Sequence, residues 1–582
     1  MARQSNYDKY PYVPSGVAGE CVLDWLRIAE QMRGGGVVCL ECYPGVLVEN
    51  VEHALMQHLP STKVFRAAEA YKPVSDIRSM VGRHLGDDRV FGRMNGLTLE
   101  DWFDPELSQI MRQQIAEAAV HGSVLVIGTG AAVLAPERNM LVYADMARWE
   151  VQLRYRRCEV GNLGCDNREA TFAEKYKCGF FVEWRAADRL KKLLLPEADF
   201  LLDTNDAATP KMIGGTAFRD ALKHLARRPF RVVPYFDPGP WGGHWMEEVC
   251  GLPKGEPNYA WCFDCVPEEN SLLLGFGDVR VEVPAIDLVF EQPRALLGEA
   301  VHARFGTEFP IRFDFLDTMG GGNLSLQVHP LTEYIQDKFG MHYTQDESYY
   351  LLDAEPGAVV YLGLKNGVDR EAMARDLRDA QTGGPAFPVE SYVNEFPARP
   401  HDHFLLPAGT IHCSGKDSMV LEISATPYIF TFKLWDWGRL GLDGRPRPIH
   451  IDHGLANIQW DRTTEWVKEQ LVHAFTPVAS GDGWREERTG LHEREFIETR
   501  RHWFTGVVPH DTHGGVNVLN LVQGSEAVVE SPTGAFEPFL VHYAETFIVP
   551  AAVGKYIVRP HGPAVGTECA TMKAYVRTEA IV

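Results

Sequence analysis

The feature that most constrains the fold is a change of sequence pattern near Arg231. Before it, apolar strand-like segments alternate with amphipathic helical segments, as in "GGGVVCLECYPG" followed by "VENVEHALMQHL". After it come short alternating segments separated by Gly and Pro, such as "SLLLGFGDVRVEV" and "DHFLLPAGTIHCSG". Strand–helix alternation predicts a parallel sheet covered by helices, whereas closely spaced short strands predict a sandwich or barrel. The chain therefore combines two fold classes.

The chain has 582 residues, a length that suggests roughly three or four domains. We predict an α/β domain at residues 1–228, a β-rich domain at 229–470 and a second β-rich domain at 471–582. Within the middle domain, "DREAMARDLRDAQT" has helical spacing and predicts a small helical insertion. In the first domain, the near-continuous apolar run "GSVLVIGTGAAVL" is typical of a strand buried in a parallel sheet. The predicted protein is multidomain.

The charge balance excludes some classes of partner. The formal net charge is −22, from 57 basic and 79 acidic residues. An acidic surface repels a phosphodiester backbone, while a local basic cluster still allows a small anionic substrate. No run approaches the roughly 18 apolar residues of a spanning helix, and the N-terminal "MARQSNYDKYPYVPSG" lacks the apolar core of a signal peptide. With eleven scattered cysteines, these features predict a cytoplasmic protein that binds neither nucleic acid nor membrane.

Two C-x-x-C pairs, Cys39/Cys42 and Cys262/Cys265, raise the alternative of a structural zinc site. The pairs are more than two hundred residues apart, and their flanking residues are strand-like. We therefore favour buried structural thiols over a shared zinc ion.

A second set of candidate ligands lies in the β-rich region. In "NLSLQVHP", Ser325, Gln327 and His329 alternate with apolar residues, so they share one face of a strand. Glu347 stands in "DESYYLLD", and His412 ends "PAGTIH". Neutral imidazoles and a carboxylate suit Zn²⁺, whereas a Gln oxygen is a rarer ligand. Spacing alone leaves open whether these residues form an open, catalytic metal site or an ordinary set of polar side chains.

Several motifs carry a family resemblance. The segments "FPIRFDFLDTMGGGNLSLQVHP", "YYLLDAEPGAVVYLGLKNGV", "HFLLPAGTIHCSGKDSMVLEIS", "FKLWDWGR" and "PWGGHW" resemble the type I mannose-6-phosphate isomerases in order and spacing. The resemblance covers roughly Arg231 to Val582, about three-fifths of the chain. "PAGTIH" is also similar to the second motif of the cupin superfamily.

The resemblance implies a fold and a ligand set. It implies a bicupin, two jelly-roll barrels of which the middle domain binds metal and the C-terminal domain lacks metal ligands. Residue by residue, the family's ligands to one zinc ion fall on Gln327, His329, Glu347 and His412. The family's catalytic and substrate-binding Arg falls on Arg439, and its substrate-contacting Ser on Ser325.

A short internal repeat agrees with the presence of two related β units. "DHFLLPAGTIH" is similar to "AETFIVPAAVGK", and each consists of an apolar strand, a Pro, small residues and the start of another strand. The first copy ends at His412 and the second at Lys555. We interpret them as two copies of one unit, of which only the first kept a ligand.

The implied activity is the interconversion of mannose 6-phosphate and fructose 6-phosphate through an enediol(ate), with a sugar phosphate as the small-molecule partner. The sequence departs from the family pattern at two positions. These departures leave two alternative functions open: a non-catalytic sugar or sugar-phosphate sensor, and an isomerase of a different sugar. Asp314 and Gln345 stand where the family commonly has lysines. Basic residues that could substitute, each more simply interpreted as a solvated surface charge, are Lys365, Lys433, Arg445 and Arg447. The sequence does not identify the proton-transfer group.

The N-terminal region resembles a degenerate nucleoside-kinase-like P-loop domain. A working loop reads G-x-x-x-x-G-K-[ST], and its Lys and backbone N–H groups bind phosphates. At the four defining positions this chain has Glu41, Val46, Leu47 and Val48. An acid and aliphatic side chains oppose anion binding, so we expect no nucleotide cofactor here. Such a domain could serve in a homodimer interface or support the isomerase domain.

Overall fold

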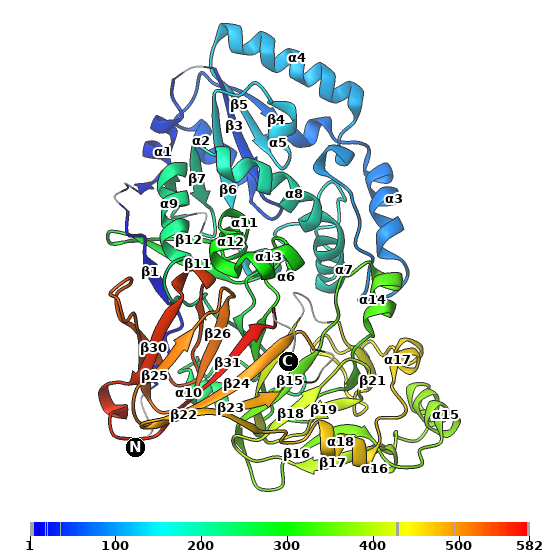
Figure 1. Cartoon of the computed structure of the whole chain (residues 1–582). Helices are drawn as coiled ribbons and strands as arrows, with labels where there is room; N and C mark the ends of the chain where they lie inside the picture. The colour runs from blue at the N-terminus through cyan, green and yellow to red at the C-terminus, as the bar shows by residue number, and fades with distance from the viewer. Residues whose placement is uncertain are drawn as a thin grey trace. The chain divides into compact units, whose positions relative to one another are not determined.

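The computed structural model describes residues 5–17, 19, 21–34, 36–206, 208–425, 430–490, 492 and 495–578 (Figure 1). The chain divides into two compact units. The α/β unit consists of Tyr12–Leu225 and Glu269–Gln292. The β unit consists of Met1–Pro11, Ala226–Glu268 and Pro293–Val582.

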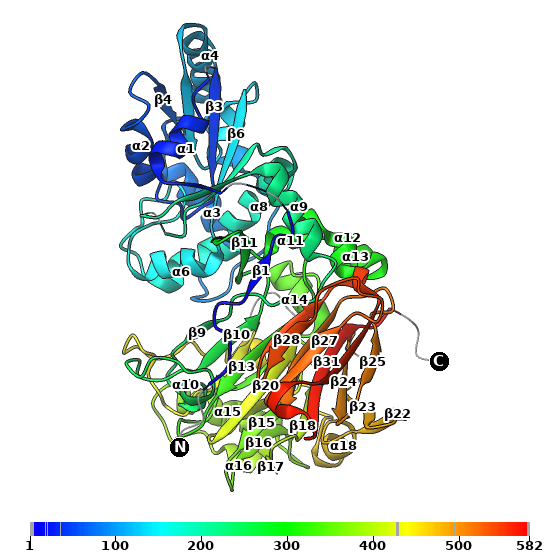
Figure 2. The same ribbon diagram turned by 90° about the vertical axis from the view of Figure 1, so that its left-hand side faces the viewer.

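The α/β unit is built on a seven-stranded sheet of order β2-β8-β7-β6-β3-β5-β4. Five of its strands are parallel, as the near-continuous apolar runs predict: β3 (Val37–Cys42), β4 (Lys63–Arg66), β5 (Val124–Gly128), β6 (Met140–Asp145) and β7 (Phe200–Asp203). Figure 2 shows β3 and β6 side by side. Two antiparallel strands extend the edge beyond β7, namely β8 (Lys211–Gly214) and β2 (Val22–Leu23).

Helices follow the parallel strands, and local sequence sets where they begin. The longest, α4 (Pro105–His121), starts with Pro at its first position, and the Asp104 side chain accepts hydrogen bonds from the amides of Glu106 and Leu107. The other principal helices are α2 (Val48–Met56), α3 (Val74–Leu85), α6 (Arg148–Arg156), α7 (Phe172–Cys178), α8 (Trp184–Leu194) and α9 (Gly215–Leu225).

A hairpin from beyond the change of pattern also belongs to the α/β unit. Strands β11 (Ser271–Phe276) and β12 (Val279–Pro284) pair with each other, and β1 (Tyr12–Pro14) pairs in parallel with β11. The short helix α11 (Ile286–Glu291) follows them. Strand spacing in this segment resembles that of the β-rich region, so its membership of the α/β unit is decided by tertiary contacts.

The first part of the β unit is a two-sheet arrangement, which we call the first sandwich. Its six-stranded sheet has the order β18-β15-β20-β13-β10-β9 and its five-stranded sheet β17-β16-β19-β14-β21. The strands of the six-stranded sheet are β18 (His403–Leu406), β15 (Glu347–Ala354), β20 (Ser418–Ser424), β13 (Arg312–Asp317), β10 (Trp261–Cys265) and β9 (Tyr235–Asp237). Those of the five-stranded sheet are β17 (Val393–Pro397), β16 (Val359–Leu364), β19 (His412–Ser414), β14 (Leu326–Val328) and β21 (Phe432–Trp435).

The second sandwich follows along the chain. Its six-stranded sheet has the order β22-β23-β24-β31-β26-β29 and its four-stranded sheet β25-β30-β27-β28. The strands are β22 (Thr476–Gly481), β23 (Trp484–Gly490), β24 (Ile497–Phe504), β25 (Val508–Asp511), β26 (Asn517–Gln523), β27 (Glu526–Glu530), β28 (Phe539–His542), β29 (Thr546–Val549), β30 (Lys555–Pro560) and β31 (Cys569–Val576). Side chains from both sheets form one apolar core, including Leu519, Leu521, Val529, Tyr556 and Val558. Each such side chain contributes about 1.5–3 kcal/mol to stability through its burial.

The structure confirms that the part of the chain after Arg231 is rich in strands and that the predicted helical insertion lies within the first sandwich. Helix α15 (Arg370–Gln381) is capped by Asp369, whose side chain accepts a hydrogen bond from the amide of Ala372.

The short internal repeat also has a structural counterpart. In the first copy the chain passes from β18 in one sheet to β19 in the other, and in the second copy it passes from β29 to β30 in the same way. His412 and Lys555 therefore each begin the strand after the crossing.

Two further expectations concern thiols and membranes. Cys39 and Cys42 lie in β3, Cys262 and Cys265 lie in β10, and all four side chains are buried, as predicted. Among the residues that the structure describes, none of the helices combines the length and apolar character needed to span a bilayer.

Candidate metal centre

The strand that carries the first candidate ligands is buried on both faces. Leu324, Leu326 and Val328 are buried on one face, as the alternation predicts. On the other face Ser325, Gln327 and His329 are only 1%, 7% and 0% exposed. Strand β14 lies between β19 and β21 in the five-stranded sheet, and the exposed fractions place its polar face in the interior. These polar side chains therefore need partners inside the first sandwich.

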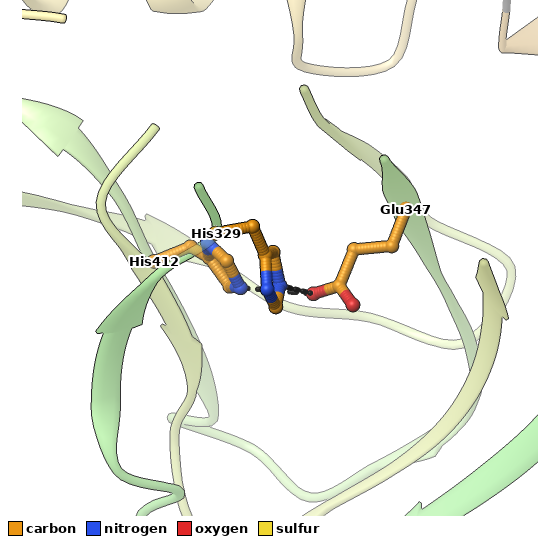
Figure 3. A group of neighbouring side chains, drawn as sticks. All are labelled: His329, Glu347 and His412. Atoms are coloured by element: carbon orange, nitrogen blue, oxygen red, sulfur yellow. Dashed lines mark ion pairs between the residues drawn. The ribbon is translucent and has the colours of Figure 1, made fainter. Parts of the chain in front are cut away.

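Three candidate ligands from different strands meet there (Figure 3). His329 follows β14 and His412 begins β19, both in the five-stranded sheet, while Glu347 begins β15 in the six-stranded sheet. Glu347 Oε1 lies 3.1 Å from His329 Nε2 and 2.8 Å from His412 Nε2. One ligand atom from each residue lies within 4.8 Å of the others. The triad thus joins the two sheets across the interior.

Backbone carbonyls determine which imidazole nitrogens face the centre. His329 Nδ1 lies 2.8 Å from the carbonyl oxygen of Phe430, and His412 Nδ1 lies 2.9 Å from that of Thr410. Because a carbonyl oxygen only accepts, each Nδ1 must carry the hydrogen and donate. In a neutral ring Nε2 then keeps its lone pair, and both Nε2 atoms point to Glu347. This is the arrangement by which a second partner orients a metal-binding His.

The electrostatics of the triad also suit a cation. Burial works to raise the pKa of Glu347, but His329 and His412 outweigh it and hold that pKa well below its usual range. Burial likewise works to lower the pKa of His329, and the Glu347 carboxylate reverses the effect and raises it. Among the described residues, His329 Nε2 and Glu347 Oε1 are buried without a hydrogen-bond partner. Two imidazole nitrogens and a carboxylate that converge in this way fit a divalent metal ion of the zinc type.

The fourth predicted ligand lies beside the triad. Gln327 is the direct cross-strand neighbour of His412, and its Nε2 lies 3.3 Å from His412 Nε2. Half a turn of the amide exchanges its nitrogen and oxygen in nearly the same space. Gln327 can therefore present an oxygen to the same centre.

Ser325 and Arg439 lie together in a polar cluster around Asp436. Ser325 Oγ donates to Asp436 Oδ1 at 2.9 Å, and Arg439 Nη2 donates to the same oxygen at 2.5 Å. Arg447 Nη1 donates to Ser325 Oγ at 3.0 Å and to Asp436 Oδ2 at 2.9 Å. Among the hydrogen bonds and ion pairs of the described residues, none joins Arg439 to the triad directly. Its connection runs through Ser325, two residues before Gln327.

Two of the four basic residues named from the sequence lie in this region. Arg447 was interpreted as a solvated surface charge, which is wrong, because its side chain is 13% exposed and bonded to Asp436. Lys433 is the direct cross-strand neighbour of Gln327, so both side chains share a face. Burial, with a smaller contribution from Arg447, lowers the pKa of Lys433 to about 7. The signal in the sequence was a lysine between the apolar Phe432 and Leu434.

The other two basic candidates lie elsewhere. Arg445 is exposed, as the surface interpretation predicts, and Lys365 donates to the backbone carbonyl of Glu390. Neither is bonded to Asp436 or to the triad among the interactions of the described residues.

Buried polar side chains occupy the two positions where lysines were expected, and one of them contacts a candidate ligand. Gln345 Nε2 donates to Glu347 Oε2 at 2.8 Å, and Gln345 Oε1 accepts from the amide of Phe430 at 2.9 Å. Asp314 is buried, and Arg312 Nε lies 3.1 Å from its Oδ1. Burial raises the pKa of Asp314 to about 6, although Arg312 opposes the shift. Gln345 therefore fixes the orientation of a candidate ligand.

In the α/β unit, the segment compared with a phosphate-binding loop contains an internal carboxylate. Glu41 in β3 accepts hydrogen bonds from the amides of Gly130, at 2.6 Å, and Ala132, at 2.8 Å. Burial raises the pKa of Glu41 to about 7, although both amides oppose the shift. The loop after β3 then leads into α2 at Val48. The amides that bind Glu41 are thereby occupied by a side chain of the protein itself.

Comparison with known proteins identifies sequence relatives of part of the chain. The chain is 27% identical over 247 residues to a mannose-6-phosphate isomerase of Streptococcus mutans, covering 41% of this chain and 72% of the relative. It is 23% identical over 241 residues to mannose-6-phosphate isomerase ManA of Bacillus subtilis, covering 40% and 69%. Residues 24–227 match a family model described as "Domain of unknown function (DUF8485)".

Solved structures were compared as well. A mannose 6-phosphate isomerase from Bacillus subtilis is 17% identical, with a TM-score of 0.49, covering 60% of this chain and 100% of that one. A structure described as mannose 6-phosphate isomerase (holo; zinc bound) is 16% identical, with a TM-score of 0.46 and the same coverage. The sequence homologues of this chain are thus type I mannose-6-phosphate isomerases, and the homology covers about two fifths of its length.

Proposed function

We propose that the protein is a metal-dependent aldose–ketose isomerase that interconverts mannose 6-phosphate and fructose 6-phosphate. The observation that carries the proposal is the buried triad, in which ligand atoms from two sheets converge on one centre and two of them, His329 Nε2 and Glu347 Oε1, have no hydrogen-bond partner among the described residues. The names of the sequence homologues supply the substrate class. The proposed cofactor is one zinc ion per chain, held by Gln327, His329, Glu347 and His412.

When bound, such an ion polarises a substrate carbonyl and stabilises the charge of an enediolate. The chain itself supplies the shape and the proton chemistry. Isomerisation removes a proton from the carbon next to the carbonyl and returns one to the former carbonyl carbon. A group that takes and returns this proton works best with a pKa near the working pH.

Lys433 is our candidate for that proton carrier. Its pKa of about 7 leaves amine and ammonium both populated at neutral pH. It projects from β21 on the same face as Gln327, beside the proposed metal ligands. A lysine with an ordinary pKa would remain protonated and could not accept the proton.

The cluster around Asp436 is our candidate for binding the sugar phosphate. Arg439 and Arg447 each retain guanidinium donors suited to an anionic group, and Ser325 Oγ offers a hydroxyl between them. Asp436 holds all three in place. Removing Arg439 should therefore weaken substrate binding without releasing the metal.

The test is a coupled isomerase assay on metal-stripped and zinc-loaded protein. We expect turnover of mannose 6-phosphate only in the zinc-loaded form, and loss of at least about 100-fold in kcat/KM for Arg439→Ala with zinc content unchanged. Lys433→Met should lower kcat, whereas Arg445→Met, at an exposed position, serves as the matched control.

A second candidate function is a non-catalytic sensor of a sugar or sugar phosphate. Gln345 favours it, since this residue holds Glu347 where a lysine was expected. Full zinc occupancy with sugar-phosphate binding but no turnover would support the sensor and contradict the isomerase. Turnover of a different, unphosphorylated aldose would instead redirect the substrate assignment.

A further inference from the structure

The interior of the second sandwich is apolar at one end and polar at the other. On the inner face of β24, Phe504 belongs to the apolar core, whereas Glu498, Arg500 and His502 line a cavity of about 460 Å³. The cavity is also lined from the opposite sheet by His510 of β25. Its volume lies within the range of small-molecule sites. We call it the polar cavity.

Two imidazoles in the polar cavity have unused hydrogen-bonding atoms. His510 is 6% exposed, and neither of its ring nitrogens has a hydrogen-bond partner among the described residues. His502 is 1% exposed, and its Nδ1 is also unpartnered there. Burial lowers the pKa of His502 to about 4 and that of His510 well below its usual range, so both rings are neutral at pH 7. His510 then offers one donor and one acceptor, whereas His502, whose Nε2 faces Glu486, offers its Nδ1.

The two rings are held in fixed positions. Their centroids lie 4.5 Å apart in an edge-to-face arrangement, and His510 stacks on Tyr556 at 4.8 Å with an interplanar angle of 8°. Such packing restricts ring rotation, so the unused atoms have a defined direction. Buried polar atoms are normally satisfied, which indicates a partner from outside the chain.

The charges around the polar cavity favour an anion. Its lining contains four basic and three acidic side chains, an excess of one positive charge in a chain of net charge −22. Arg500 forms ion pairs with Glu486 and Glu498. Lys573 is 7% exposed and makes a cation–π contact with Tyr575. Among the hydrogen bonds and ion pairs of the described residues, none involves the Lys573 ammonium.

A metal ion is a poorer occupant. Within the described part of the chain, the triad of the first sandwich is the group of His, Cys, Asp and Glu whose ligand atoms converge closely enough for a metal. In the polar cavity, His502 Nε2 lies 3.5 Å from Glu486 Oε1, and that carboxylate already pairs with Arg500. The Lys573 ammonium would also repel a metal cation placed beside the two imidazoles.

We propose that the polar cavity is a second small-molecule site, which binds a hydroxylated organic anion of sugar-acid or sugar-phosphate size. The anionic group pairs with the Lys573 ammonium. Hydroxyl groups of the ligand donate to His502 Nδ1 and exchange hydrogen bonds with His510, which can both donate and accept. The site is separate from the metal centre, because all its lining residues belong to the second sandwich or the segment directly after it.

Calorimetric titration of the zinc-loaded full chain tests the proposal. The probes are D-gluconate 6-phosphate, D-gluconate, inorganic phosphate and the uncharged D-glucitol. We expect a binding component that Lys573→Met weakens at least about tenfold, the effect of losing a charge-assisted hydrogen bond, and that Lys573→Arg largely restores. Lys555→Met changes an exposed lysine of the same sandwich and should leave it unchanged.

Each outcome either supports or contradicts the proposed second site. A Lys573-dependent component with gluconate identifies a carboxylate site, and one with the phosphorylated probe or phosphate alone identifies a phosphate site. Binding that is equal in Lys573→Met and Lys555→Met, or no binding beyond the metal centre, would mean that water fills the cavity and would overturn the proposal. If Lys573→Met fails to fold, His510→Phe, which keeps the stacking on Tyr556, is judged by the same criteria. Isomerase turnover is measured separately, so its absence would not affect this result.

Discussion

The two sandwiches of the β unit use the same crossing between sheets for different purposes. In the first, β18 leads to β19, and His412 at the start of β19 turns into the interior beside Glu347 and His329. In the second, β29 leads to β30, and the corresponding Lys555 is exposed. The second sandwich places its polar groups on β24, β25 and β31 instead. Two segments that follow the same backbone path can therefore carry functional side chains at different positions.

The difference has a physical reason. A metal centre needs lone pairs that converge from several strands, and the first sandwich brings them from both sheets. The interior of the second sandwich is instead filled by an apolar core over part of its length. What remains is a cavity with two neutral imidazoles and an ammonium that forms no hydrogen bond or ion pair among the described residues, which suits an organic anion better than a metal.

The largest expected effect separates the two crossings directly. His412→Ala removes a candidate ligand from the buried triad, so we expect loss of stoichiometric zinc and a fall in isomerase activity of at least about 100-fold. Changing a residue that only supports a metal ligand costs up to about 100-fold, and loss of a ligand itself should cost at least as much. Lys555→Ala, at the corresponding crossing, should change neither. Metal analysis and the coupled assay check both variants. Retention of zinc by His412→Ala would remove the basis for the comparison.

A smaller effect is expected at Gln345, which orients Glu347. Gln345→Glu places a second carboxylate where an amide donor stood, so it loses the hydrogen bond and repels Glu347. We expect zinc affinity to fall about 10- to 100-fold, as for other residues that support a ligand. Competition with a chromophoric chelator measures the affinity. Gln336→Glu, on the surface of helix α14 (Thr332–Phe339), is the matched control, and equal affinities for the two variants would contradict a positioning role.

The smallest expected effect is on stability and compares Lys433 with Lys573. Burial lowers the pKa of Lys433 to about 7 and that of Lys573 to about 8, whereas an unfolded lysine titrates near about 10.4. Between these values the unfolded chain binds more protons, so the wild-type free energy of unfolding rises with pH. Each lysine thus destabilises the fold most at or below its folded pKa.

Lys433→Met and Lys573→Met should therefore raise the melting temperature more at pH 6.5 than at pH 9.5. Differential scanning calorimetry of the metal-stripped chain at both pH values measures the difference, with Lys555→Met as the exposed control. A shift that is the same at both pH values would show that the ammonium is not destabilised by burial in that sandwich.

Much of the fold follows from local patterns. Apolar runs such as "VLVIG" predicted the parallel strands, and the helical spacing of "DREAMARDLRDAQT" predicted helix α15. The hairpin of β11 and β12 could not be assigned to its unit in this way. Its strands look like the others in sequence, and the sheet that a strand joins depends on contacts with distant residues.

The same division applies to the sites. The sequence alone placed Ser325, Gln327 and His329 on one face, and its motifs pointed to Glu347 and His412. It could not show that Lys433 faces Gln327, that Gln345 holds Glu347 or that His502 and His510 face one cavity. Periodicity fixes the face of a strand that a side chain occupies, because it is a property of neighbouring residues. Only the tertiary structure decides what that face meets, because pKa values and unpaired atoms depend on burial and on partners far away in the chain.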